Sequence, residues 1–215
     1  MQLIRNQLGM RKLSQELKEN LPFSIEGAFT TFEIKRLQEL LKLMEDNPEH
    51  QALTSGDANY GGIRTESSER IAYETMIPPT PEFNWYYEKL EDLVYKVNES
   101  VYKFNLTMIA EPSIYLRYDG DEQGKYDPHI DIGPTYPTSL RKLSSTIILN
   151  DDYEGGDLIF NGVGMESEDG KQNSMYPKTP GTIIFFPSYL VHGVTPVTKG
   201  TRYAIVTWIH GPSFV

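Results

Sequence analysis

Residues 143–160 read LSSTIILNDDYEGGDLIF, and this stretch sets the expectation for the fold. The run Leu143–Asn150 is rich in aliphatic and β-branched residues, which favour a buried strand. The acidic segment Asp152–Asp157 contains two adjacent glycines and is typical of a tight turn. Apolar residues return in Asp157–Phe160. The stretch therefore predicts two short strands joined by a turn, a pattern common in β-sandwiches and barrels.

Similar short runs of β-branched and aromatic residues continue through the second half of the chain, from about residue 106 onward. Glycine, proline and aspartate separate these runs, which is typical of an all-β core. We therefore expect a mainly β domain with helices packed against one face of the sheet. The other expected strands are Ser113–Tyr118, Thr182–Pro187, Gly193–Val197 and Arg202–Ile209.

The pattern before residue 105 is mostly helical. One helix is expected to begin near Thr30, because Thr30 and Glu33 have the spacing of a capping box. A second is expected to begin after Thr80, with Pro81 in the first helical position and an apolar stripe that runs to Phe104. We interpret both apolar stripes as core packing.

Two further segments of the first half are less regular. Residues 3–17 are expected to form another helix. Residues 50–79 lie between the two main helices, are polar, and are expected to be irregular. Long irregular segments in a compact domain often carry function, so Gly62–Thr65 is a candidate wall of a substrate site.

The composition excludes several classes of protein. A chain of 215 residues suits a single domain, with one core that can carry helical additions. The formal charge of −10 makes nucleic acid an unfavourable partner. The absence of cysteine rules out thiolate nucleophiles, zinc–thiolate sites and iron–sulfur clusters. No apolar run approaches the roughly 20 residues that span a bilayer, and we expect a cytoplasmic protein.

Three residues have the composition of a metal site. His129 and Asp131 are two apart in an extended segment, so their side chains point to the same face. His192 follows soon after the expected strand 182–187. Two histidines and one carboxylate form the facial arrangement of non-haem Fe(II), which leaves three positions open. His-x-Asp alone is a weak signal that is also found in solvated loops. The two other histidines, His50 and His210, match no motif and are expected to be structural or solvated.

Arg202 follows ten residues after His192, within a largely apolar expected strand. A buried guanidinium requires an anion, and its planar fork suits a carboxylate. A keto acid such as 2-oxoglutarate could chelate iron at one end and offer a carboxylate to Arg202 at the other. An internal salt bridge to an aspartate or glutamate is the alternative interpretation.

A series of short motifs follows in a defined order and spacing over nearly half of the chain. They are Tyr118, His129 with Asp131, Leu149-Asn150, Tyr153 to Leu158, Gly181-Thr182, Phe185 to Pro187, His192 to Val194, Pro196-Val197, and Gly200 to Tyr203. In this order the span from about Ser113 to Ile209 resembles the prolyl 4-hydroxylase-like branch of the Fe(II)/2-oxoglutarate dioxygenases.

The resemblance implies a double-stranded β-helix (jelly-roll) core over residues 106–215, with residues 1–105 as a helical layer and substrate-side region of one domain, 1–215. It implies Fe(II), 2-oxoglutarate and O2 as cofactors, with ascorbate as an optional addition. Tyr118 is implied to hold 2-oxoglutarate through its hydroxyl group. The implied reaction hydroxylates a C–H bond and releases succinate and CO2.

One position departs from the pattern. Some relatives carry a tyrosine that contacts the distal carboxylate of 2-oxoglutarate, and Ile148 stands in that place here. Thr146 or Ser144 could substitute for it. The loop Asp119–Lys125 contains two glycines and is a candidate lid, with a plain surface turn as the alternative.

The resemblance makes a prolyl residue of a peptide or protein the first expectation for the substrate. A free amino acid or another small molecule is the alternative. A non-catalytic binding module on the same fold is the least favoured, because the three expected iron ligands and Arg202 are all present. Nucleobase demethylation is disfavoured by the negative charge. The sequence leaves the oligomeric state open.

Overall fold

The computed structural model describes residues 21–45, 63–66, 69–160 and 176–213. The helix expected over residues 3–17, His50, and Gly62 of the candidate wall lie outside these residues, whereas residues 63–65 of that wall lie within them. None of the helices within them is long and apolar enough to cross a membrane.

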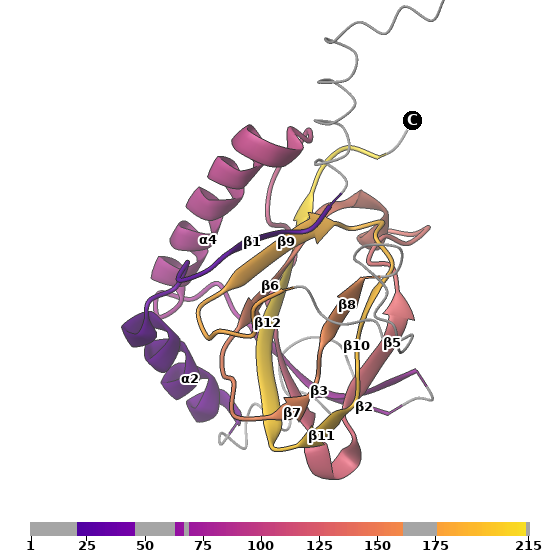
Figure 1. Ribbon diagram of the computed structural model, residues 1–215. Helices are drawn as coiled ribbons and strands as arrows, with labels where there is room; N and C mark the ends of the chain where they lie inside the picture. The colour runs from indigo at the N-terminus through magenta and orange to yellow at the C-terminus, as the bar shows by residue number, and fades with distance from the viewer. Residues whose placement is uncertain (1–20, 46–62, 67–68, 161–175, 214–215) are drawn as a thin grey trace, which may run out of the picture.

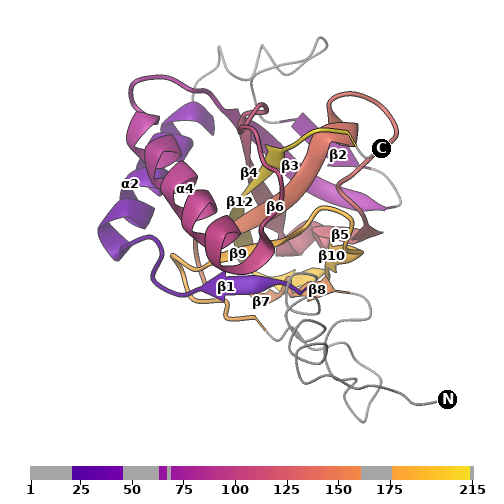
Figure 2. The same cartoon turned by 90° about the horizontal axis from the view of Figure 1, so that it is seen from above.

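A single large antiparallel sheet forms the centre of the part of the chain that the structure describes. It curls around an interior space, and both helices lie on its outer side (Figures 1 and 2). Its strands lie in the order β1 (Phe23–Ile25), β9 (Ile183–Pro187), β6 (Arg141–Ile148), β12 (Thr201–His210), β4 (Ser113–Asp119), β3 (Arg70–Ile77), β5 (Lys125–His129), β10 (His192–Val194) and β8 (Leu158–Phe160), with β2 (Ile63–Glu66) beside β3. A separate pair joins β7 (Glu154–Gly155) and β11 (Val197–Lys199).

Two helices cover the outer face. They are α2 (Thr31–Glu45) and α4 (Asn84–Val97), which continues into the π-helical turn η1 (Asn98–Tyr102). The expected capping box is present, since the Glu33 N–H donates to Thr30 Oγ1 at 3.3 Å and the Thr30 N–H donates to Glu33 Oε2 at 2.7 Å. Lys89 of α4 pairs with Glu33 at 2.6 Å and so ties the two helices together.

The core has two parts, one on each face of the sheet. The outer part packs helix residues such as Leu37 and Leu90 against Leu143 and Ile147 of β6. Because side chains alternate along a strand, Ile148 of β6 faces the interior of the curl. It packs there with the other buried residues of the inner cluster, which include Tyr118, Leu158, Phe160, Ile184 and Phe186. The inner face is therefore the one that can build a site.

The expected strands are all present, with shifted ends. One expected strand, Gly193–Val197, is divided between β10 and β11, because the chain leaves the main sheet between them. The second helix begins at Asn84, since residues 81–83 form a turn, and its α-helical part ends before Phe104.

The expectation of an irregular segment over residues 50–79 was wrong for two parts of it. Residues 63–66 form β2, which pairs with β3. Residues 70–77 form β3, which pairs with β4 in the middle of the sheet. Arg70 and Glu74 gave this strand its polar character, and both line the interior cavity. The polarity therefore reflects a cavity wall and not a solvated loop. The division of the chain near residue 105 does not divide the sheet, and the single-domain assignment stays a prediction.

The loop after β4 is held against its neighbours. It forms the 3₁₀ turn η2 (Gly120–Glu122), and the Gly120 N–H donates to the Gly200 carbonyl at 2.8 Å. A Cβ atom at Gly120 or Gly124 would lie 2.8 Å from backbone atoms. Glycine is therefore needed at both positions because the backbone of neighbouring segments lies so close. The hinge motion of a lid is not required to explain it. The last short element is the 3₁₀ turn η3 (Thr138–Leu140).

Candidate metal and co-substrate site

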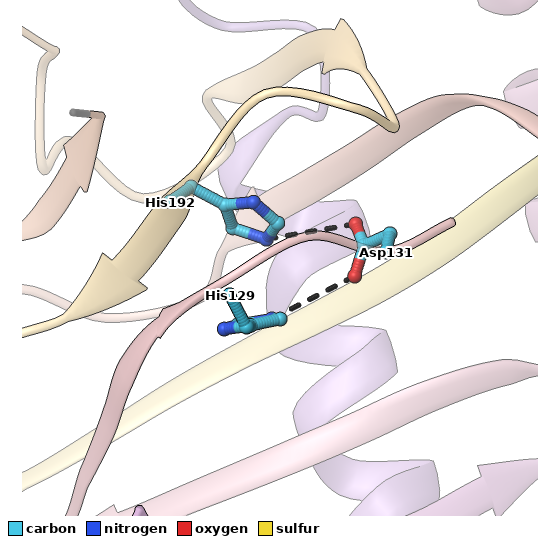
Figure 3. A group of neighbouring side chains, drawn as sticks. All are labelled: His129, Asp131 and His192. Atoms are coloured by element: carbon cyan, nitrogen blue, oxygen red, sulfur yellow. Dashed lines mark ion pairs between the residues drawn. The ribbon is translucent and has the colours of Figure 1, made fainter. Parts of the chain in front are cut away.

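The pairing of β5 with β10 brings the two histidines of the expected triad together. His192 lies directly opposite His129 in the register, and Asp131 follows two residues after His129. The Nε2 atom of His129 lies 3.7 Å from Asp131 Oδ1, and that of His192 lies 3.5 Å from Asp131 Oδ2. The side chains point toward one another (Figure 3), and their ligand atoms lie within 4.8 Å of one another. Three donors thus converge on one point.

Backbone carbonyl groups orient both imidazole rings. The Nδ1 atom of His129 lies 2.9 Å from the carbonyl oxygen of Asp127, and that of His192 lies 2.9 Å from the carbonyl oxygen of Leu190. With a proton on each Nδ1, the lone pair of each ring is on Nε2, the atom that faces the carboxylate. This second-shell arrangement is common around metal-binding histidines.

The protonation states suit a cation. Burial opposes the ionisation of Asp131, but the His129 and His192 rings and the Ser144 hydroxyl outweigh it and lower the pKa of Asp131 to about 2. Burial lowers the pKa of the His192 imidazole. One carboxylate with imidazole ligands is the donor set expected for a divalent transition metal.

Ser144 has a role that the sequence did not reveal. Its hydroxyl donates to Asp131 Oδ2 at 2.6 Å and lies 2.9 Å from the hydroxyl of Ser188. The Asp131 N–H also donates to the Ser188 carbonyl at 2.9 Å. Ser144 therefore orients the Asp131 carboxylate, and the structure does not support it as a contact of the distal carboxylate.

Arg202 is buried on β12, directly opposite Tyr118 on β4, with only 2% of its surface exposed. Its guanidinium carbon lies 5.3 Å from the centre of the Tyr118 ring. Within the described ranges Arg202 has no acidic partner, and its buried Nε atom has no hydrogen-bond partner. The alternative of an internal salt bridge is thus not found there. A buried guanidinium with an unsatisfied donor fits an anionic ligand.

The three-donor cluster and Arg202 line one cavity of about 480 Å³. The cavity is large enough for a small organic ligand. Thr146, the remaining sequence-predicted residue, lines it as well. The predicted residues on its wall are Tyr118, His129, Asp131, Thr146, His192 and Arg202.

Several residues of the cavity wall carried no recognisable signal in the sequence. Arg70 lies over the ring of Tyr126 at 4.3 Å, and Tyr126 stacks on His129 with ring centres 3.6 Å apart. Residues three apart do not share a face in a regular strand, so the stacking could not be predicted. Tyr126 thereby packs against one face of the His129 ring.

A second group of wall residues lies beside Asp131. Arg141 makes two hydrogen bonds to the carboxylate of Glu111 and lies 3.7 Å from the centre of the Trp208 ring. His210 lies 2.8 Å from the same carboxylate, is only 2% exposed, and does not line the cavity. The structural interpretation of His210 is therefore supported. These contacts join strands that are far apart in the sequence.

Two imidazoles and a carboxylate that line one cavity with a buried arginine are the residue types of a non-haem Fe(II) site with room for an anionic ligand. Comparison with known proteins agrees. Residues 113–210 match the model of the 2OG-Fe(II) oxygenase superfamily, and the chain is similar to proteins of its prolyl 4-hydroxylase-like branch. The family implies Fe(II), 2-oxoglutarate and O2 as cofactors.

Similar curated proteins are named PKHD-type hydroxylases. One from Alteromonas mediterranea is 37% identical over 105 residues, which cover 46% of this chain and 42% of that protein. Another from Paraburkholderia xenovorans is 32% identical over 161 residues, which cover 71% of this chain and 63% of that protein. The matched part of the chain thus spans about two fifths to two thirds of the length of these relatives.

Solved structures of prolyl hydroxylases share the fold. A Pseudomonas putida prolyl-4-hydroxylase gives a TM-score of 0.62 at 16% identity, over 95% of this chain and 100% of that one. A Trichoplax adhaerens prolyl hydroxylase, solved in complex with a hypoxia-inducible-factor peptide fragment, also gives 0.62 at 16% identity, over 96% and 94%. The expected jelly-roll fold is confirmed.

Proposed function

We propose that this chain is an Fe(II)- and 2-oxoglutarate-dependent dioxygenase that hydroxylates a C–H bond of a peptide or protein, with a prolyl residue as the first candidate. His129, Asp131 and His192 would hold the iron. Arg202 would pair with the distal carboxylate of 2-oxoglutarate, and the Tyr118 hydroxyl would lie close to it. Thr146 is a further candidate contact of the co-substrate.

The observation that carries the proposal is that a three-donor cluster and a buried arginine without an acidic partner in the described chain share one cavity. A dicarboxylic keto acid has groups for both ends, because its 1-carboxylate and 2-oxo groups can chelate a metal while its second carboxylate remains available. A ligand with a single anionic group would leave one of the two ends without a charged partner.

The protein residues would bind, orient and shield the reactants. Bound Fe(II) and 2-oxoglutarate supply the oxidative chemistry, in which O2 is consumed, succinate and CO2 are released and one oxygen atom enters the substrate. The facial triad leaves three coordination positions for the co-substrate and O2. The apolar part of the wall would keep water from the reacting atoms, and it is formed by residues that include Met76, Ile114, Leu116, Phe186 and Val206.

The peptide substrate is supported by likeness to prolyl hydroxylases, one of which was solved with a peptide. A free amino acid or other small polar molecule is the second candidate. It is favoured by the two Arg–Glu pairs on the cavity wall, Arg70 with Glu74 and Arg141 with Glu111, which offer charges of both signs.

The proposal is tested by succinate release from 2-oxoglutarate by the purified chain with Fe(II) and O2. We expect release that increases with a proline-containing peptide pool and disappears in His192→Ala. Stimulation by a metabolite pool alone would assign the small-molecule class instead. A parent protein that binds neither Mn(II) nor 2-oxoglutarate would exclude the dioxygenase.

A further inference from the structure

We infer that Tyr153 is a second contact of the distal carboxylate of 2-oxoglutarate and supplies the polar group that Ile148 lacks. The inference rests on the proposed function, because it concerns the same co-substrate. Its basis is a small cavity behind Arg202 that is distinct from the large one.

The small cavity has a volume of about 10 Å³, enough for one water molecule or one ligand oxygen atom. It shares Arg202 and Leu158 with the large cavity, so the two cavities adjoin at these residues. Its remaining wall is formed by residues that include Ile148, Tyr153, Tyr176, Lys178 and Ile184.

Two of the polar side chains around this cavity already have partners. The ammonium group of Lys178 donates to the Gly155 carbonyl at 2.7 Å and pairs with Asp157 at 2.7 Å. The hydroxyl of Tyr176 donates to the Pro22 carbonyl at 3.4 Å. The Tyr176 hydroxyl proton is therefore already used, and the charge of Lys178 is balanced by Asp157.

The other two polar groups are unsatisfied. The Tyr153 hydroxyl and Arg202 Nε are both buried, and neither has a hydrogen-bond partner among the described residues. Leaving two such donors buried without an acceptor is costly. One oxygen atom that accepts from both would remove the cost, and a carboxylate oxygen accepts more than one hydrogen bond.

The turn after β6 carries Tyr153 to the arginine. A Cβ atom at Gly156 would lie 2.9 Å from Arg202 Cδ and 3.1 Å from Tyr153 Cε2, so the two side chains meet at this glycine. Asn150 fixes the turn against β12, since its side chain donates to the Thr201 carbonyl and accepts from the Tyr203 N–H, both at 2.7 Å. The turn therefore brings the Tyr153 ring and the Arg202 side chain against the same glycine.

The chemistry favours a carboxylate as the occupant. Ile148 borders the same cavity and has no polar atom to offer. The phenol and the guanidinium would each donate a hydrogen bond to one carboxylate oxygen. Hydrogen bonds that involve an ionised group are stronger than those between neutral groups. A structural water is the alternative occupant. In that case Tyr153 would affect the binding of ligands with and without a second carboxylate equally.

The test compares Tyr153→Phe with Tyr176→Phe, whose hydroxyl is already used by Pro22. Calorimetric titrations are made without O2 on the Mn(II)-loaded full chain. The ligands are 2-oxoglutarate and 2-oxopentanoate, which has the same carbon chain without the second carboxylate. We expect Tyr153→Phe to weaken 2-oxoglutarate binding at least about tenfold and to leave 2-oxopentanoate binding unchanged. Tyr176→Phe should change neither affinity.

The outcomes separate this inference from the proposed function. If the parent binds 2-oxoglutarate, Arg202→Ala weakens that binding and Tyr153→Phe does not, the inference is wrong and the dioxygenase stands. An equal loss for both ligands also overturns the inference, since the effect would not involve the distal carboxylate. If the parent does not bind 2-oxoglutarate at all, the proposed function itself fails. Mn(II) affinity and the thermal unfolding midpoint establish that each variant is folded.

Discussion

The two ends of the active-site cavity differ in how far the protein satisfies its own polar groups. At the metal end, Asp131 accepts from Ser144, and both imidazole rings are oriented by backbone carbonyls. At the other end, Arg202 has a buried polar atom with no partner in the described chain, as has Tyr153 in the small cavity that adjoins it. The metal end is therefore organised before any ligand binds, whereas the arginine end depends on the ligand for its hydrogen bonds.

The largest expected effect is the loss of metal from the organised end. His192→Ala removes one of three donors, and we expect metal affinity to fall by well over about a hundredfold, because loss of a second-shell partner alone costs 10–100-fold. Titration with Mn(II) or Co(II) measures it. His210→Gln is the matched control, since His210 pairs with Glu111 outside the triad. Full metal stoichiometry in His192→Ala would exclude the assigned site.

Arg202→Ala should act on the other end alone. Removing one partner of a buried charge pair costs roughly 3–5 kcal/mol, so 2-oxoglutarate should bind at least about a hundredfold more weakly. Metal affinity should not change, because Arg202 is not a ligand. Arg202→Lys should restore binding only in part, since an ammonium lacks the planar fork. Parent-like binding of 2-oxoglutarate by Arg202→Ala would remove the co-substrate assignment.

A smaller effect on the metal end should come from its supporting hydroxyl. Ser144→Ala deletes the hydrogen bond to Asp131 Oδ2, and second-shell losses of this kind lower metal affinity by about 10–100-fold. Ser145→Ala is the control, because the neighbouring hydroxyl lies near the Thr207 carbonyl at 3.5 Å and not near Asp131. Equal Co(II) affinities of the two variants would show that Ser144 does not organise the site.

The unsatisfied arginine also predicts how the stability of the protein depends on 2-oxoglutarate. Without ligand, a buried arginine with an unsatisfied donor is unfavourable, so Arg202→Met should stabilise the ligand-free protein by about 1–3 kcal/mol while abolishing the 2-oxoglutarate effect. Urea unfolding with and without 2-oxoglutarate and Mn(II) measures both. A variant that is less stable than the parent without ligand would mean that Arg202 is satisfied in solution.

The smallest expected effect lies away from both ends. Thr30→Ala removes the N-terminal cap of α2 and should lower the free energy of unfolding by about 1 kcal/mol. The affinities for Mn(II) and for 2-oxoglutarate should equal those of the parent. A change in either affinity would mean that the helical layer is coupled to the cavity.

The sequence by itself predicted β4, β6, β8, β9 and β12, the cap of α2, and the candidate residues His129, Asp131, His192 and Arg202, which line one cavity. These depend on local patterns, such as alternation, capping and the motif spacings from Tyr118 to Tyr203. The fold class and the family followed from them. The sequence could not show that residues 70–77 form a strand, because their polar side chains face a cavity and so hide the apolar pattern of a core strand.

Only the tertiary structure decided how the polar groups are shared. Ser144 and Thr146 are equivalent by position, since both lie on the inner face of β6, but Ser144 is bonded to Asp131 and Thr146 lines the cavity. Tyr153 comes beside Arg202 because a glycine turn and the bonds of Asn150 fold it against β12. Hydrogen-bond partners are set by atoms that meet across the sheet from distant parts of the chain, and no local pattern records which atoms those are.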